Sequence, residues 1–209
     1  MHDPYTYGET DVLINKQNIK NLKIFEEMEA EYTGMRLREI AVRPLKGNYD
    51  FEHFCKIHQY IFQDIFDWAG ETRTVNIEKP EDVLGGISIE YTDVKEIQSL
   101  AEITITKMTS VEWENLNIDE KAKQFSKYLA ALWKIHCFRE GNTRTVVHFC
   151  CQYADHIKMP LDRSIFEHNS LYFRNALVAA TAVFSDLGDK SNLEYLIKIV
   201  RDALEKGTK

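Results

Sequence analysis

Proline and glycine are scarce in this chain of 209 residues, which contains four prolines and nine glycines. Because both residues interrupt regular structure, the long stretches between them favour helices over a fold of many short strands. No apolar run approaches the length of about 18 residues that suggests a membrane-spanning helix. Residues 1–10 are polar and lack the apolar segment of a signal peptide. The sequence therefore predicts a mostly helical, cytoplasmic protein without a membrane partner.

Long basic runs are also missing, and the formal net charge is −7. Affinity for duplex nucleic acid comes largely from neutralising phosphates, so this charge argues against a nucleic-acid partner. A local basic pocket for a nucleotide stays compatible with it. The chain has no GxxxxGK[ST] phosphate loop, which disfavours an ordinary ATPase.

Cysteines number only four, and a cytoplasmic protein keeps them reduced. Cys55 and His58 are one helical turn apart, a spacing that zinc ligands can use, but no second pair has zinc-finger spacing. The preferred interpretation is a buried thiol and a core histidine, with a structural zinc as the alternative.

Apolar residues at helical spacing predict seven helices after an extended arm at residues 1–14. Asp50 is expected to cap the second helix, and Asn117 with Glu120 has the capping-box pattern at the start of the fourth. The glutamates of the first helix are interpreted as a solvated face. The expected helices span about residues 20–39, 50–68, 93–108, 117–136, 143–159, 170–184 and 192–204.

Residues 71–92 break the helical pattern. Apolar and polar side chains alternate on both sides of Pro80 and the pair Gly85-Gly86, which predicts a short β-hairpin or flap. An isolated hairpin is marginally stable, so it is expected to lie against the helical body. The length then predicts one all-α domain over residues 1–209, with the arm and first helix in 1–45 and the core in 46–209.

Residues 136–145 read His-Cys-Phe-Arg-Glu-Gly-Asn-Thr-Arg-Thr and fall between two predicted helices. Unpaired N–H groups at a helix N-terminus attract anions, and Gly141 lets a phosphate come close. Glu140 beside this cradle would repel phosphate unless a divalent cation, Mg²⁺ or Mn²⁺, bridged the two. Arg144 lies where the helix dipole disfavours a cation, which marks it as a functional candidate. His136 is the candidate general base.

An ordinary helix–turn–helix junction is the alternative. In that interpretation Gly141 ends a helix, Glu140 and Arg144 lie on the surface, and His136 is a hydrogen-bonded core residue. The density of chemically specialised residues in ten positions argues against it.

The same stretch resembles the signature of the Fic domain family, His-x-Phe-x-(Asp/Glu)-Gly-Asn-x-Arg. Residues 11–16 are similar to the family's N-terminal arm, and residues 57–75 are similar to its helix and the entry to its flap. The resemblance implies an all-α Fic fold with a short β-hairpin flap near residues 74–91. It also implies a protein adenylyltransferase, which transfers AMP from ATP to a Ser, Thr or Tyr hydroxyl of a protein target or of itself.

The resemblance assigns roles to single residues. His136 would be the general base, Glu140 would hold Mg²⁺ (or Mn²⁺), and Arg144 would stabilise the phosphates. The phosphate cradle would consist of Gly141, Asn142 and Thr143. Tyr172 and Asn175 on a later helix would face the adenine. Four flap residues would align the target segment by strand addition, namely Val75, Asn76, Ile77 and Ile87.

Three positions depart from the family pattern. Cys137 replaces the usual proline, Thr143 replaces the usual second glycine and can cap the helix with its hydroxyl, and Val147 stands where many members have a second arginine. That arginine contacts the γ-phosphate and pairs with the glutamate of an inhibitory helix, and valine does neither. The inhibitory pattern Ser/Thr-x-x-x-Glu-Gly/Asn is matched at residues 110–115, which we interpret as coincidence. An inhibitory partner protein and a homodimer therefore both stay open, although no motif specifies the homodimer.

Two alternatives accompany the adenylyltransferase prediction. The same scaffold can carry a phosphotransferase, or transfer another nucleotide or phosphocholine. A protein of a different class, an inactive nucleotide-binding or interaction module, would also explain the three departures. The joint presence of His136, Glu140, Asn142 and Arg144 favours the enzyme.

Overall fold

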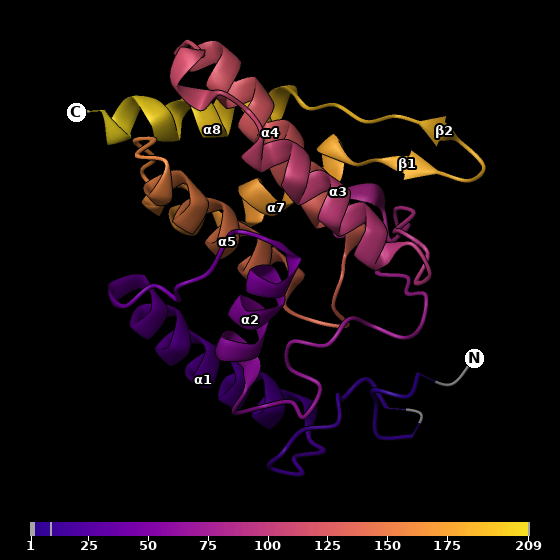
Figure 1. Ribbon diagram of the computed structural model, residues 1–209. Coiled ribbons are helices and arrows are strands. Elements are labelled where there is room, and N and C mark those ends of the chain that lie inside the picture. Colours follow the sequence, from indigo (N-terminus) through magenta and orange to yellow (C-terminus); the bar gives the residue numbers. More distant parts are fainter. Residues whose placement is uncertain (1–2, 9, 209) are drawn as a thin grey trace.

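The computed structural model describes residues 3–8 and 10–208 (Figure 1). Within this part of the chain lie eight α-helices, two 3₁₀ turns and one short pair of strands, which confirms the predicted mostly helical fold. The helices are α1 (Leu22–Val42), α2 (Phe51–Phe62), α3 (Ile97–Thr109), α4 (Ile118–Ile135), α5 (Asn142–His156), α6 (Ser164–His168), α7 (Ser170–Ala180) and α8 (Glu194–Gly207). The 3₁₀ turns are η1 (Asp82–Leu84) and η2 (Trp113–Asn115), and the strands are β1 (Val183–Phe184) and β2 (Gly188–Asp189).

Local capping signals set the helix starts where the sequence predicted them. The Asp50 side chain accepts a hydrogen bond from the His53 N–H at 2.8 Å and starts α2. Asn117 and Glu120 form the predicted capping box of α4, each side chain accepting from the other's backbone N–H. Such caps satisfy N–H groups that have no partner within the helix, so they fix a helix start from a few residues.

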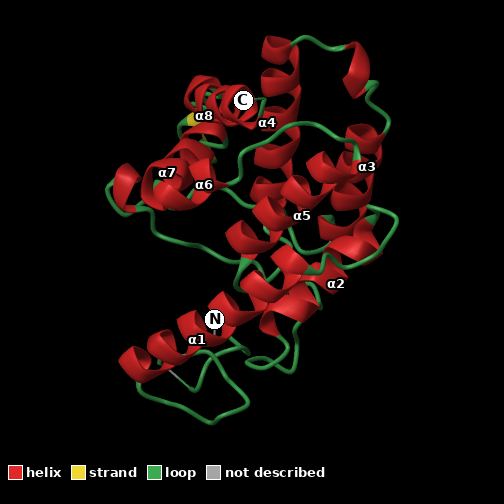
Figure 2. Cartoon of the chain, turned by 90° about the vertical axis from the view of Figure 1, so that its left-hand side faces the viewer, coloured by secondary structure: helices red, strands yellow, loops and turns green. Residues whose placement is uncertain are grey.

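The core extends between the two ends of the molecule. Helices α1 and α2 lie at one end and α8 lies at the other, with α4 and α5 between them (Figures 1 and 2). Buried apolar side chains from Val12 to Leu204 form one continuous cluster, and Trp133 of α4 is fully buried within it. Among the described residues, none of the helices combines the length and the apolar character that a membrane span requires.

The regular hairpin does not lie where the sequence predicted it. Strands β1 and β2 pair antiparallel, with Val183 opposite Asp189, whereas residues 74–92, here called the flap, hold a single antiparallel bridge between Glu81 and Ile87. The predicted position of the hairpin, near residues 74–91, is therefore corrected. The flap still lies against the body, because its Glu90 N–H donates to the Val183 carbonyl of β1 at 3.0 Å.

Side chains explain why the flap forms no ladder. The guanidinium of Arg73 donates to the carbonyls of Val75 and Thr92, which occupies acceptors on both arms of the flap. The Lys79 N–H donates to the Ser88 hydroxyl at 3.0 Å instead of to a facing carbonyl. Pro80 has no N–H to donate at all. The alternating pattern is present in the sequence, but these contacts replace strand pairing.

Candidate active site

The loop between α4 and α5 places an open helix N-terminus at the centre of the site. Gly141 precedes α5 with φ of 77°, and a Cβ on it would lie 2.1 Å from Cζ of Phe62. Glycine is therefore required both for its backbone conformation and for the close approach of the ring. In the described part of the chain, no acceptor receives the backbone N–H groups of residues 142–144. Three free donors and the positive end of the helix dipole make this an anion cradle.

Asn142 shapes the cradle instead of reaching into it. Its side-chain Nδ2 donates to the Phe138 carbonyl at 2.7 Å, and its Oδ1 accepts the Phe138 N–H at 2.9 Å. This reciprocal pair closes the loop over residues 138–142. The side chain is buried and committed to the loop, so only its backbone N–H faces an anion.

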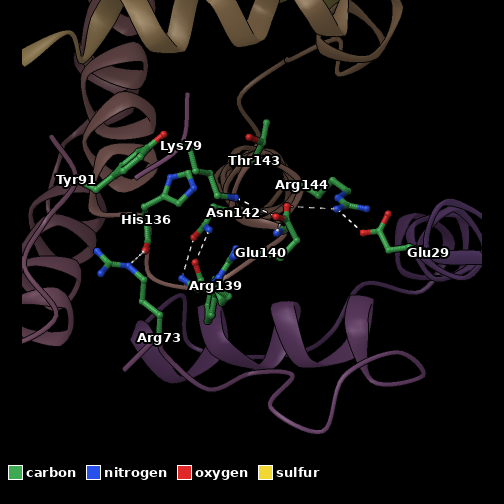
Figure 3. Close-up of polar contacts among 12 residues, drawn as sticks. Glu29, Arg73, Lys79, Tyr91, His136, Arg139, Glu140, Asn142, Thr143 and Arg144 are labelled. Carbon is green, nitrogen blue, oxygen red and sulfur yellow. Dashed lines mark hydrogen bonds and ion pairs between the residues drawn. The ribbon is translucent and has the colours of Figure 1, made fainter. Parts of the chain in front are cut away.

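His136 lies at the end of α4, across the loop from the cradle (Figure 3). Its φ of 51° places a non-glycine residue in the left-handed region, a strain that often marks functional positions. The ring nitrogen Nδ1 is 3.1 Å from the Trp133 carbonyl, which can only accept, so Nδ1 carries the proton and Nε2 holds a lone pair. The Tyr91 ring packs on the imidazole with the ring centroids 4.1 Å apart.

The environment keeps this imidazole neutral. Burial lowers the pKa of His136 well below its ordinary value, and the nearby charge of Lys79 lowers it further. The hydrogen bond to the Trp133 carbonyl acts in the opposite direction but does not outweigh them. A neutral imidazole with a free Nε2 lone pair is the form that a general base needs.

Glu140 stands next to the cradle as an ionised carboxylate. Burial alone would raise the pKa of Glu140, yet the Lys79 charge and the hydrogen bond from the Gly141 N–H outweigh it and hold the pKa at about 2. The Lys79 ammonium is 2.9 Å from Oε2, and the Gly141 N–H donates to Oε1 at 2.9 Å. Lys79 comes from the flap, so the flap contacts the cradle through an ion pair.

Thr143 and Arg144 make contacts that the sequence did not predict. The Thr143 hydroxyl accepts a hydrogen bond from the Trp133 indole N–H at 2.8 Å, so it joins α5 to α4 and does not cap its own helix. The Arg144 guanidinium extends toward α1, where its Nη2 lies 2.6 Å from Glu29 Oε1, while the distance from Nη2 to Glu140 Oε1 is 3.9 Å. Figure 3 shows Arg144 between these two carboxylates.

A cavity of about 120 Å³ joins the predicted residues. Its lining consists of Lys79, His136, Glu140, Gly141, Asn142, Thr143, Arg144 and Arg174. One cavity is therefore lined by His136, Glu140, the anion cradle and Arg144. Three of the lining side chains are cationic and one is anionic, which suits a ligand of several negative charges.

Sequence reasoning missed Lys79 and Arg174 in this lining. Lys79 lies within the segment that was interpreted as a hairpin arm, and its spacing gave no sign of the contact with Glu140. Arg174 belongs to α7, where its guanidinium pairs with the buried carboxylate of Glu81 at 2.8 Å. Tyr91 donates its hydroxyl to the same carboxylate at 3.3 Å, so the flap, α7 and the ring beside His136 are connected.

Tyr172 does not line this cavity. Its side chain is half exposed and lines a separate cavity with residues of α6 and α8, including Ile165 and Lys206. Asn175, three residues further along α7, lies on a neighbouring position of the same helix side. The adenine contact expected from Tyr172 and Asn175 stays a prediction, and Arg174 is the α7 residue that lines the cavity beside the cradle.

The predicted target-binding residues of the flap lie outside the cradle. Asn76, Ile77 and Ile87 line a cavity of about 860 Å³ between the flap and the β1–β2 turn. The amide of Asn76 donates to Asp93 at 2.8 Å and accepts the Val94 N–H at 2.9 Å, which fixes the two ends of the flap to each other. Val75 contributes its carbonyl to Arg73.

Two further sequence features have clear positions. Val147 lines a mostly apolar cavity of about 240 Å³ together with Thr143 and Arg144. An uncharged side chain therefore occupies the position of the second arginine in the family pattern. Both ring nitrogens of His58 are occupied, since Nδ1 accepts the Gly70 N–H and Nε2 donates to the Glu140 carbonyl. His58 therefore has no lone pair for a metal and acts as a core histidine under the catalytic loop.

Comparison with known proteins places the chain in a family. The sequence pattern of the Fic/DOC family matches residues 48–154, slightly more than half of the chain. The chain is 32% identical over 154 residues to the protein adenylyltransferase VbhT of Bartonella schoenbuchensis, and the match covers 73% of this chain and 31% of VbhT. It is 31% identical over 171 residues to the probable protein adenylyltransferase y4lH of Sinorhizobium fredii, covering 80% of this chain and 83% of y4lH.

Solved structures share the fold. The BepC protein of Bartonella tribocorum, crystallised with bound AMPPNP, superposes with a TM-score of 0.76 at 21% identity, over 95% of both chains. An N-terminal Fic domain of Bartonella quintana with bound ADP gives a TM-score of 0.77 at 23% identity, over 95% of this chain and 93% of that one. At these identities the likeness is one of fold, and it agrees with the match of residues 48–154. The chain is a member of the Fic/DOC family.

Proposed function

We propose that the protein is an adenylyltransferase, which transfers AMP from ATP to a hydroxyl side chain of a protein. The observation that carries the proposal is the single cavity in which the neutral imidazole of His136 faces the free N–H groups of the α5 N-terminus and the carboxylate of Glu140. A base, an anion cradle and an ionised carboxylate are the parts that nucleotidyl transfer needs. The names of VbhT, a protein adenylyltransferase, and y4lH, a probable protein adenylyltransferase, support the same activity.

His136 starts the reaction by removing a proton. Its Nε2 lone pair takes the proton of the target hydroxyl as the hydroxyl oxygen attacks the α-phosphorus of ATP. A bond forms between that oxygen and the α-phosphorus, the bond from the α-phosphorus to the bridging oxygen breaks, and pyrophosphate leaves. The Trp133 carbonyl and the Tyr91 ring hold the imidazole, which lines the cavity, in a fixed position.

The cradle and its cations hold the phosphates. The N–H groups of residues 142–144 donate to phosphate oxygens, and Arg144 with Lys79 balances their charge. These donors are in place before a nucleotide arrives, so little reorganisation is needed as charge builds on the leaving pyrophosphate. Arg174 of α7 lines the same cavity and adds a third cation to it.

The residues around Glu140 fit a magnesium ion that is shared with the nucleotide. Mg²⁺ is usually bound by one or two carboxylates together with phosphate oxygens, and Glu140 is an ionised carboxylate beside the cradle. Within the described residues there is no cluster of three acidic, histidine or cysteine side chains, so the phosphates have to supply further ligands. When bound, the ion neutralises phosphate charge. Lys79 occupies Oε2 of Glu140 and has to yield that oxygen.

The target protein is expected to approach from the flap side. Asn76, Ile77 and Ile87 face the cavity of about 860 Å³ that opens between the flap and the β1–β2 turn. An extended target segment along these residues would bring its hydroxyl to His136. This assignment gives the flap residues the role of target alignment, separate from the nucleotide contacts.

The test uses ATP labelled separately at the α- and γ-phosphates. The protein and its His136→Ala variant are incubated with Mg²⁺, each labelled ATP and a cell lysate as a source of targets. Label from the α-position alone, on the protein itself or on lysate proteins, is expected with the wild type and absent with His136→Ala. Label from the γ-position would mean phosphorylation instead, and no label from either position would favour a binding module without activity.

A further inference from the structure

Helix α1 contributes two side chains to the site, although it lies outside the residues 48–154 that the family description matches. Glu29 and Thr33 are four residues apart on α1 and therefore share one face of the helix. Both contact the guanidinium of Arg144. The sequence placed Glu29 on a solvated face, but only 15% of its side chain is exposed.

Three contacts hold the guanidinium of Arg144 in place. Its Nη2 lies 2.6 Å from Glu29 Oε1, its Nη1 donates to the Thr33 hydroxyl at 3.1 Å, and its central carbon is 4.8 Å from the centre of the Phe62 ring. The Thr33 hydroxyl donates its own proton to the Glu29 carbonyl at 2.7 Å, so a lone pair is directed at Arg144. An arginine has five N–H donors, and these contacts leave Nε–H and further N–H groups free for a ligand.

Two carboxylates compete for this cation. Glu29 Oε1 is 2.6 Å from Nη2 and Glu140 Oε1 is 3.9 Å from the same atom. Without Glu29, the guanidinium can move the remaining distance to Glu140. That movement would neutralise the carboxylate beside the cradle and withdraw the arginine from the phosphates.

We propose that Glu29 and Thr33 are positioning residues, which hold Arg144 beside the phosphate cradle and away from Glu140. The inference rests on the proposed function only in that the ligand of the cradle is a nucleotide. Fixing the guanidinium in advance removes the cost of ordering a long side chain when the phosphates bind, so the effect is expected in nucleotide affinity.

The experiment compares variants of α1 that differ in one contact each. Glu29→Gln keeps the size of the side chain and removes its charge, and Thr33→Val keeps the shape and removes the acceptor for Nη1. Thr33→Ser retains the hydroxyl and serves as the rescue variant. Glu27→Gln, at an exposed position of the same helix, is the matched control for loss of one negative charge.

Glu29→Gln is expected to raise the KM for ATP about tenfold while kcat changes about twofold or less, because the lost contact orients a binding group. Thr33→Val is expected to raise KM by a smaller factor, and Thr33→Ser to restore it. Thermal unfolding of all four variants and direct titration with ATP by calorimetry accompany the kinetics. The calorimetry measures the same effect even if the wild type transfers no AMP, so it separates this inference from the proposed function.

Two results would overturn the inference. A KM and an ATP affinity equal to those of Glu27→Gln would mean that the contact is structural. Tighter ATP binding by Glu29→Gln would mean that the carboxylate competes with phosphate for Arg144 and does not position it.

Discussion

Replacing Gly141 by alanine tests the geometry of the cradle most directly. The residue has φ of 77°, and an added Cβ would lie 2.1 Å and 2.2 Å from two carbons of the Phe62 ring. Carbon atoms in contact are normally about 3.5–4.0 Å apart. The ring or the loop therefore has to move by more than an ångström to admit one methyl group.

Two costs add up for this variant. An L-residue in the left-handed region costs about 1–2 kcal/mol relative to glycine. Overpacking a filled core costs about 1–3 kcal/mol more. We expect Gly141→Ala to lower the free energy of unfolding by about 2–5 kcal/mol, measured by urea denaturation with the slope of the transition unchanged.

Two further variants separate the contributions. Gly188→Ala has a similar φ of 71° and no atom within 4 Å of the added Cβ, so it is expected to show the backbone cost alone. Phe62→Leu combined with Gly141→Ala should recover part of the packing cost relative to the sum of the single changes, which a double-mutant cycle measures. Loss of less than about 0.5 kcal/mol in Gly141→Ala, or strict additivity with Phe62→Leu, would refute the reasoning.

Two other predictions follow from charge and burial. Lys79→Met removes a cation that lowers the pKa of both Glu140 and His136, so both pKa values should rise. The acid limb of the pH profile of kcat/KM should then move to higher pH. An acid limb at the same pH as in the wild type would show that Lys79 does not act on His136. Burial lowers the pKa of His58 to about 3 from an ordinary 6.5, so the unfolded chain binds a proton that the folded chain does not. As the pH decreases from 6.5 toward 3, His58 should therefore lower the free energy of unfolding by about 1.4 kcal/mol per pH unit. The free energy of unfolding of His58→Asn should depend less steeply on pH. Equal slopes of the two proteins, measured by urea denaturation, would contradict this.

Features that depend on a few neighbouring residues could be predicted from the sequence. The caps at Asp50 and Asn117 act within one helical turn, and the structure has them as expected. The anion cradle before α5 also follows locally, because a glycine ahead of a helix start determines it. His136, Glu140 and the cradle meet in one cavity for the same reason, since they are neighbours along one loop.

Features that depend on distant contacts could not be predicted. The flap lacks strands because Arg73 occupies carbonyls on both of its arms, and the alternating pattern contains no sign of that. Tyr172 and Arg174 are two residues apart on α7, and only the packing of the helix decides which of them points into the cavity. Glu29 resembles its exposed neighbours in sequence and becomes part of the site only because α1 lies against Arg144.

Arg73 has a consequence for the flap, to which we assign the alignment of the target. Its guanidinium donates to the His136 carbonyl at 2.8 Å and to the carbonyls at both ends of the flap, so the catalytic loop and the flap base form one rigid unit. The residues between these two anchors, 76–91, can then vary in sequence while the anchors stay in place. Their sequence can change without disturbing His136, provided that position 79 stays cationic, position 81 stays acidic and position 91 keeps the ring that packs on the imidazole. With the role in target alignment that we propose for the flap, a change of target would then leave the loop of residues 136–145 unchanged.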